Sequence, residues 1–336
     1  MPARIIKVPP DEAGQRLDRW LRNLLPGLSF PYLQKLLRKG EIRVGGSRAR
    51  PNTRLNGGDE VRLPPRLAAM LEGEERQSPA LSDNDWQLFE RMKLFEDDYL
   101  LILDKPSGMP VQGGGRMRLH VDRYLQALAE REAARWRLVH RLDRDTSGVL
   151  VIAKSRSIAA DMGRKFSSRA VRKIYWAVVH GLPRPRQGLI ENELVKARTR
   201  DGERMAVAGH LPEGARPISD PQAARTRYSL IEAAGNRAAW LSLKPTTGRT
   251  HQLRVHMAHL GHPIIGDPRY GGLENMERLP REMERKLHLH ARRISFPHPV
   301  SGDLLDITAP LPEHMAASFS LLGFDPERYE RRGKQR

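Results

Sequence analysis

The stretch HRLDRDTSGVLVIA, at residues 140–153, joins a cluster of charged side chains to an apolar run. The apolar part, Gly148 to Ala153, has the composition of a buried β-strand. Ser147 and Gly148 form a turn signal, so the charged residues should lie on a loop at the edge of a sheet, where active-site groups are often found. The stretch therefore predicts a core strand with a candidate functional loop at its start.

Asp143 is the candidate reactive group of this loop. It stands between Arg141 and Arg144, and nearby positive charge favours the ionised form of a carboxyl group. An ionised and firmly held carboxylate can attack an electrophilic sugar carbon. The residues alone leave another interpretation open, because Asp143 and Asp145 could instead be structural ion-pair partners of the arginines, or caps.

Apolar runs on both sides of this loop predict a strand-rich domain. Strands are expected at 99–103, 148–153, 173–179 and 239–243, and helices near 121–134, 157–166 and 250–260. Strands outnumber helices and their spacing is irregular. We therefore expect an α+β fold, built on a mixed, largely antiparallel sheet with flanking helices, over residues 86–312.

Residues 248–261, GRTHQLRVHMAHLG, form a second candidate site segment. His251 and Arg254 are three residues apart and therefore neighbours on the predicted helix. Arg254 is suited to a bidentate grip on a buried carboxylate. The histidines at 251, 256, 259 and 262 raise the alternative of a zinc site. They lack the usual ligand spacing and have no acidic residue among them, so we expect no metal.

Two further segments complete the candidate site. Lys173 and Tyr175 alternate along a predicted strand and should face the same side, where the tyrosine could stack on a nucleobase. Packing of Tyr175 in the core is the alternative. Residues 105–115, KPSGMPVQGGG, form a glycine-rich loop that matches no phosphate-binding motif and by itself indicates little.

The N-terminal zone, residues 8–64, predicts a small basic domain. Two stretches with helical spacing of apolar residues are followed by two short strands. Up to residue 64 the chain carries 13 Lys and Arg against 6 Asp and Glu. We interpret this zone as a platform for a phosphate backbone, with a solvated polar face as the alternative. The residues expected to contact this backbone are Arg16, Arg19, Arg22, Lys35, Arg38, Lys39 and Arg43.

Composition supports a nucleic-acid partner. The chain of 336 residues has a net charge of +18, which is typical of proteins that bind a polyanion, although a merely basic surface is not excluded. The absence of cysteine excludes disulfides and thiol nucleophiles. No apolar run approaches the ~20 residues of a membrane span, and the first residues do not look like a signal peptide, so we expect a cytoplasmic protein.

Residues 65–85 are expected to be a linker and residues 313–336 a tail, disordered from Glu327 onward.

Five segments together resemble the RluA-type RNA pseudouridine synthases. An N-terminal run, PDEAGQRLD at 10–18, further resembles the S4-type RNA-binding domain that precedes the catalytic domain in many members. Within the family, the chain is most similar to enzymes that modify several uridines of large-subunit (23S) ribosomal RNA. The five segments are LDKPSGMPVQGG at 103–114, HRLDRDTSG at 140–148, RKIYWAVVHG at 172–181, TTGRTHQLRVHMAHLGHPIIGDPRYGG at 246–272 and LHLHARRISFPHP at 287–299.

The resemblance implies an isomerase that breaks the uracil N1–ribose C1′ bond and rejoins the base through C5, without cofactor or metal. Asp143 would be the nucleophile, Tyr175 would stack on the flipped base, and Arg254 would pair with Asp143. Arg141 would fill the gap that the flipped base leaves. Whether Asp143 attacks C1′ or first removes a C2′ proton stays open. His140, Ile294 and Leu260 are the remaining expected substrate-pocket residues.

Ribosomal RNA is the expected partner, and we expect a monomer. The segment 191–224 varies in the family and is expected to influence which RNA is bound. Three alternatives stay open: a related synthase for other ribosomal uridines, a non-catalytic RNA-binding factor in ribosome assembly, and a glycosidase that uses Asp143 and Asp145 as its carboxylate pair.

Overall fold

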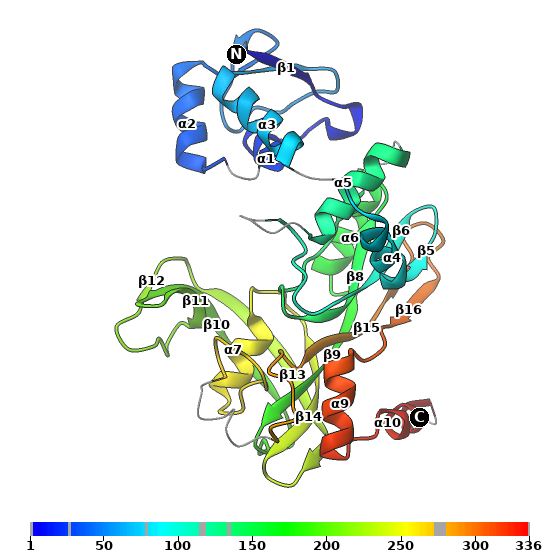
Figure 1. The fold of residues 1–336 in the computed structure, drawn as a ribbon. Helices are drawn as coiled ribbons and strands as arrows, with labels where there is room; N and C mark the ends of the chain where they lie inside the picture. Colours follow the sequence, from blue (N-terminus) through cyan, green and yellow to red (C-terminus); the bar gives the residue numbers. More distant parts are fainter. Residues whose placement is uncertain are drawn as a thin grey trace. The chain divides into compact units, whose positions relative to one another are not determined.

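The computed structural model describes residues 3–25, 28–77, 80–113, 119–132, 136–271 and 280–334. The chain divides into two compact units, and each is treated by itself (Figure 1). The first unit comprises residues 1–88 with 112–135. The second comprises residues 89–111 with 136–336, and helix α4 (Asp83–Met92) crosses the division between them.

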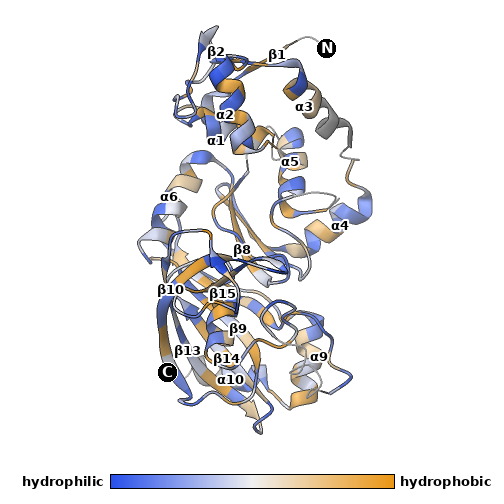
Figure 2. Ribbon diagram, turned by 90° about the vertical axis from the view of Figure 1, so that its left-hand side faces the viewer, coloured by the Kyte–Doolittle hydropathy of each residue, from blue (hydrophilic) through white to orange (hydrophobic). Residues whose placement is uncertain are grey.

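The first unit contains a four-stranded antiparallel sheet and amphipathic helices. The sheet order is β1-β4-β2-β3. Helices α1 and α2 show polar and apolar residues side by side in Figure 2, and their apolar faces supply Leu17, Leu21 and Leu33 to the core. The elements are β1 (Arg4–Lys7), a 3-10 turn (Pro10–Glu12), α1 (Leu17–Leu24), α2 (Phe30–Lys39), β2 (Arg43–Val44), β3 (Ser47–Arg48), β4 (Glu60–Leu63), α3 (Pro65–Gln77) and α5 (Val121–Glu132).

The expected linker at 65–85 differs from the structure. Residues 65–77 form helix α3, and Leu67 and Leu71 are buried in the core of the N-terminal unit. Proline opens this helix at its first position, where its missing N–H group costs nothing, and the residues that follow favour a helix. The segment was predicted to be a linker because most of its residues are polar, and composition alone does not reveal that these two leucines are buried.

The second unit is built on a twelve-stranded sheet, of order β11-β10-β13-β14-β9-β15-β8-β6-β5, with β12, β16 and β7 paired beside this path. Every pairing is antiparallel except that of β15 with β8, which confirms the expected mixed, largely antiparallel sheet. Its strands are β5 (Lys93–Glu96), β6 (Leu100–Lys105), β7 (Arg137–Leu138), β8 (Ser147–Ala153), β9 (Arg172–His180), β10 (Gln187–Thr199), β11 (Gly202–Val207), β12 (Arg216–Pro217), β13 (Gln222–Ala234), β14 (Ala238–Pro245), β15 (Leu289–Pro297) and β16 (Leu304–Thr308).

Two helices cover opposite faces of this sheet at β9 and β14. Trp176 and Trp240 pack against Phe319 of α9 (Glu313–Leu322). The residues that alternate with them, such as Ala177 and Leu241, belong to the core that contains Leu253 of α7 (Gln252–His259). Because side chains alternate along a strand, this arrangement turns Tyr175 toward the face that α7 covers. Helix α6 (Arg156–Ser167) packs through Met162 in a separate core with Val149.

The C-terminal segment also differs from expectation. Residues 313–322 form α9, whose Met315 and Phe319 are buried, and α10 (Pro326–Lys334) is helical although most of its residues are polar or charged. The expected tail therefore contributes to the core of the second unit. No described helix is long and apolar enough to cross a membrane.

Candidate active site

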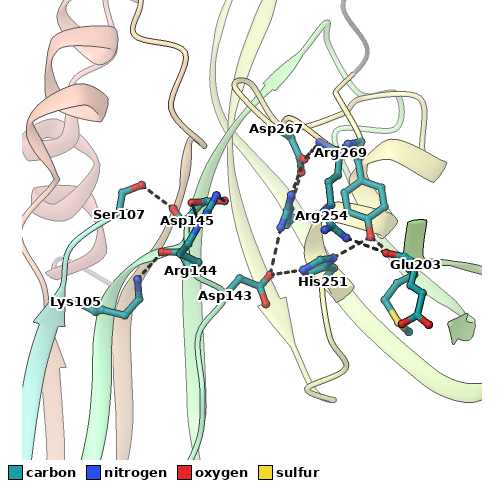
Figure 3. Close-up of polar contacts among 12 residues, drawn as sticks. Lys105, Ser107, Asp143, Arg144, Asp145, Glu203, His251, Arg254, Asp267 and Arg269 are labelled. Atoms are coloured by element: carbon teal, nitrogen blue, oxygen red, sulfur yellow. Dashed lines mark hydrogen bonds and ion pairs between the residues drawn. The ribbon is translucent and has the colours of Figure 1, made fainter. Parts of the chain in front are cut away.

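Asp143 lies on the loop between β7 and β8, in a turn closed by a 3.2 Å hydrogen bond from Thr146 N to the Asp143 carbonyl. Its side chain is 21% exposed, and Oδ2 faces two groups from the α7 segment (Figure 3). Arg254 Nη1 is 3.7 Å away and His251 Nε2 is 3.9 Å away. Arg144, expected beside Asp143, pairs instead with Asp145 through a 2.9 Å contact. The positive charge at Asp143 therefore comes from Arg254, more than a hundred positions away in the sequence.

Arg254 is held chiefly by a second carboxylate, Asp267. The Nε and Nη2 atoms of Arg254 each donate to Asp267 at 2.7 Å, which leaves Nη1 to face Asp143. Asp267 is buried and also accepts from the backbone N–H groups of Arg269 and Tyr270. Burial by itself would lower the pKa of Arg254, but Asp267, and then Asp143, raise it overall. The bidentate grip expected from Arg254 exists, and its partner is Asp267.

His251 begins α7 in a left-handed backbone conformation, with φ of 54°, which is unusual for a residue other than glycine. Its Nδ1 lies 2.9 Å from the hydroxyl of Tyr270, and that hydroxyl accepts from Met205 N at 3.3 Å. The tyrosine proton is thus available to Nδ1, and we assign the His251 proton to Nε2, toward Asp143. Burial lowers the pKa of His251, which favours the neutral ring.

Tyr175 lines the same cavity from β9. Burial, and then the negative charge of Asp143, raise the pKa of its phenol. Tyr175 therefore stays protonated near neutral pH, with its ring beside the carboxylate. This placement is compatible with stacking on a base, because the ring borders open space as well as the core.

The first part of the glycine-rich segment, residues 105–109, holds the Asp143 loop in place, and residues 114 and 115 of that segment lie outside the described residues. The buried Lys105 ammonium donates to the carbonyls of Pro106, Met109 and Arg144 at 2.8–2.9 Å. Ser107 Oγ donates to the Asp145 carbonyl at 2.8 Å. Burial lowers the pKa of Lys105 to about 7. These bonds fix the backbone on the C-terminal side of Asp143, a role that follows from tertiary contacts and has no signature in local sequence.

Gly148, at the start of β8, allows a close backbone approach between β8 and β15. Its φ is +105°, and a Cβ atom there would lie 2.3 Å from the carbonyl oxygen of Ala291 on β15. Ser147 Oγ lies 2.9 Å from Nδ1 of the buried His290 on the same strand. The parallel pairing of β8 with β15 thus fixes the C-terminal end of the Asp143 loop.

A cavity of ≈ 510 Å³ opens over Asp143, large enough for a nucleoside. All three residues expected to carry the chemistry line it, as do His140 and Arg141. The described lining residues are Val139, His140, Arg141, Leu142, Asp143, Thr146, Phe166, Ser167, Arg169, Lys173, Tyr175, Pro245, Thr246, Thr247, Gly248, Arg249, His251, Gln252, Leu253, Arg254 and Leu289.

His140 lines this cavity, and one of its two ring nitrogens already has a hydrogen-bond partner. Its Nε2 accepts a 2.9 Å hydrogen bond from Val151 N, and its ring stacks on Phe166. Burial, and then the charge of Lys173, lower the pKa of His140 to about 3. His140 therefore stays neutral. Arg141 is exposed at the cavity.

Ile294 and Leu260, expected as pocket walls, are not among the described lining residues. Ile294 is buried in the core beneath α6, and Leu260 packs at the edge of the core beneath α7. The apolar walls that the structure does provide include Val139, Leu142, Phe166, Leu253 and Leu289. Both misplacements have the same cause, because a pattern of apolar residues does not distinguish a pocket wall from a core position.

The basic residues expected to bind RNA fall into two groups. Two of them form ion pairs, Arg16 with Asp18 and Lys39 with Glu41. Two others, Arg22 and Arg43, donate hydrogen bonds to backbone carbonyls. In the part of the chain that the structure describes, the side chains of the other three are exposed and make no hydrogen bond or ion pair. These three are Arg19, Lys35 and Arg38.

The histidines of the α7 segment have protein partners. His256 Nδ1 lies 2.9 Å from Thr226 Oγ1, and His262 Nδ1 lies 2.8 Å from the His180 carbonyl. Within the described ranges, no three His, Asp or Glu side chains are arranged to hold a metal ion. Asp145, paired with Arg144, is not among the described lining residues, so it does not form a carboxylate pair across the cavity with Asp143.

Comparisons with known proteins agree with this geometry. The family described as RNA pseudouridylate synthase matches residues 99–259, and the S4 domain family matches residues 15–61. Ribosomal large subunit pseudouridine synthase C of Yersinia pestis is 40% identical over 308 residues, which are 92% of each chain. Its counterpart from Escherichia coli (strain K12) is 38% identical over 318 residues, 92% of this chain and 93% of the relative.

A solved structure extends the similarity to the fold. Human RNA pseudouridylate synthase domain containing 4 is 29% identical, with a TM-score of 0.58 over 71% of this chain and 95% of that one. The resemblance predicted from the five segments is thereby confirmed. This chain belongs to the RluA-type RNA pseudouridine synthases, in the form that carries an N-terminal S4 domain.

Proposed function

We propose that this pseudouridine synthase isomerises specific uridines of large-subunit (23S) ribosomal RNA. The observation that carries the proposal is Asp143, the one carboxylate among the described residues lining a nucleoside-sized cavity, flanked there by Tyr175 and Arg254. Similarity to the large-subunit synthases over nine-tenths of the chain supports the choice of substrate.

Each residue has a task that its surroundings support. Asp143 acts as the nucleophile, and Arg254 and His251 keep its carboxylate in place. Tyr175 stacks on the flipped base, and its protonated hydroxyl lies beside the reacting groups. Exposed Arg141 takes the space that the base leaves, which offsets part of the few kcal/mol that flipping costs. The isomerisation returns every atom to the product, so the reaction needs no external electron carrier.

The S4 unit is proposed to bind the RNA backbone near the target uridine. The side chains of Arg19, Lys35 and Arg38 are exposed and make no hydrogen bond or ion pair in the described part of the chain, so of the seven they are best placed to meet phosphates. A ribosomal RNA substrate would place the enzyme in the cytoplasm.

Replacement of the nucleophile tests the proposal. Pseudouridines in 23S RNA are mapped by sequencing in a deletion strain that carries either the wild-type gene or Asp143→Asn. We expect the wild type to restore specific sites and Asp143→Asn to restore none. Purified Asp143→Asn should lose activity by a factor on the order of 10³ or more while it still binds RNA.

Two outcomes would reject parts of this proposal. Wild-type turnover by Asp143→Asn would show that Asp143 is not the nucleophile. Release of free uracil from RNA would indicate a glycosidase, and restoration of ribosome assembly by Asp143→Asn without pseudouridine would favour a binding factor.

A further inference from the structure

The cavity carries more positive charge than the proposed reaction uses. Among its described lining residues, five are Lys or Arg and one is an acid, Asp143. Asp143 already faces Arg254 and His251. Partly desolvated cations are stable only when an anion or other polar partner meets them. Arg141, Arg169 and Arg249 are exposed and Arg254 is paired with Asp267, so Lys173 is the partly desolvated cation that an anionic part of the ligand, beyond the uracil ring, would meet.

Lys173 shows this excess most clearly. Its side chain is partly buried at the cavity, and burial lowers the pKa of its ammonium group. Within the described ranges its ammonium group has no hydrogen-bond or ion-pair partner, and its Nζ lies 5.7 Å from the centre of the Phe166 ring. The other neighbour of that ring, His140, is neutral and supplies no negative charge. Lys173 is thus a partly desolvated cation at an open cavity without an acidic partner.

Arg169 is a second, independent sign of a binding role. It follows the C-cap of α6 in a left-handed conformation with φ of 64°, and Ala170 N donates back to the Lys165 carbonyl. Glycine is the usual residue in this position, because a left-handed backbone costs other residues about 1–2 kcal/mol. Arg169 lines the cavity and, in the described part of the chain, has no ion-pair partner. Strain of this kind is often retained at functional sites.

Lys173 and Arg169 both lie close in the chain to Tyr175, on which the base is proposed to stack. Lys173 and Tyr175 lie two residues apart on β9 and both line the cavity, so they are separated by about 7 Å along the strand. Arg169 precedes the same strand. We propose that Lys173 and Arg169 form a phosphate subsite that holds the phosphate of the nucleotide whose base lies on Tyr175. This proposal rests on the proposed function, because it takes a uridine nucleotide as the ligand.

Small nucleotides test the subsite without turnover. Binding of uridine, uridine 3′-monophosphate and uridine 5′-monophosphate to the full chain is measured by calorimetry. We expect one monophosphate to bind about tenfold more tightly than uridine, as one charge-assisted hydrogen bond predicts. The preferred isomer identifies which phosphate is held. Lys173→Met should abolish the preference, and Lys173→Arg should retain most of it.

A matched control separates the subsite from general charge. Arg172 neighbours Lys173 on β9, is exposed and is not among the described lining residues, so Arg172→Met removes one charge at nearly the same place. It should leave the monophosphate preference within twofold of wild type. The proposal is overturned if the wild type shows no preference, if both variants weaken it equally, or if Lys173→Met weakens uridine and its monophosphates alike.

Arg169 is tested by two substitutions that differ only in backbone strain. Arg169→Ala and Arg169→Gly should both reduce the monophosphate preference, because both remove the guanidinium. Arg169→Gly should also unfold at a higher temperature than Arg169→Ala, because glycine adopts the left-handed conformation freely. If neither variant changes the preference, Arg169 is not part of the subsite.

These measurements stand apart from the test of the proposed function. If the mapped 23S RNA shows no modification but the monophosphate preference depends on Lys173, the function fails and the subsite stands. If the RNA is modified and Lys173→Met has wild-type affinity for the monophosphates, the subsite fails and the function stands.

Discussion

Arg254 illustrates how the reactive carboxylate is positioned from a distance. Its guanidinium is fixed by two hydrogen bonds to the buried Asp267, and only then can the third nitrogen face Asp143. Tyr270, three residues beyond Asp267, orients His251 toward the same carboxylate. One turn at residues 267–270 therefore controls both groups that contact Asp143.

Asp267→Asn should reveal this control. The substitution removes one charge from a buried ion pair and leaves Arg254 poorly compensated, which typically destabilises a protein by about 3–5 kcal/mol. Because Arg254 would no longer be held at a fixed angle, we expect kcat to fall at least tenfold with little change in KM. Steady-state kinetics on an RNA substrate and urea unfolding measure the two effects.

Asp145→Asn is the control, since it makes the same chemical change two residues from Asp143. Asp145 pairs with Arg144 near the surface, where such pairs contribute about 0–1 kcal/mol. We expect the kcat of Asp145→Asn to stay within threefold of the wild-type value. A wild-type kcat in Asp267→Asn would mean that Asp267 has no positioning role.

Among the elements, the β8–β15 pair decides where the Asp143 loop ends. The two strands run parallel at Ser147 and Gly148, and the approach is close because Gly148 lacks a side chain. The loop is thereby held at its end by β15 as well as by the clamp from Lys105.

Gly148→Ala should therefore be severely destabilising. The new methyl group would have to displace the Ala291 carbonyl, at a backbone φ that alanine rarely adopts. We expect a loss of several kcal/mol, seen as a large drop in the thermal unfolding temperature or as failure to fold. Gly163→Ala, in α6 with open space around it, should instead be neutral or stabilise by up to about 1 kcal/mol. Equal unfolding temperatures for the two variants would contradict this account of the β8–β15 contact.

For the molecule as a whole, buried histidines make stability depend on pH. His256, His288 and His290 are fully buried, and burial lowers their pKa values to about 4, 4 and 3. Between these values and about 6.5 the unfolded chain binds more protons than the folded one. The contribution of each histidine is complete above pH 6.5 and is lost as the pH falls toward 4.

We therefore expect stability to fall between pH 7 and pH 5, by up to about 2 kcal/mol for each buried histidine. Urea unfolding at both pH values measures the loss. His290→Asn should reduce the pH dependence of stability, whereas His210→Asn, at an exposed position that does not act on the three buried histidines, should leave it unchanged. Equal stability at pH 7 and pH 5 would contradict the assignment of these histidines as buried and neutral.

Much of the protein was predictable from its sequence because the relevant signals are local. Apolar runs mark β8, β9 and β14, helical spacing marks α1 and α2, and the order of the five segments identifies the family. Asp143, Tyr175 and Arg254 were selected in the same way, and the structure brings all three to one cavity.

Tertiary structure alone decided which groups meet. Three features depend on the path of the twelve-stranded sheet. Asp267 holds Arg254, Lys105 donates to the Arg144 carbonyl, and Ile294 lies in the core. Local sequence reports which residues favour a strand, a helix or burial. The partner of a buried charge is fixed by contacts between strands far apart in the chain, and these form only when the whole sheet packs.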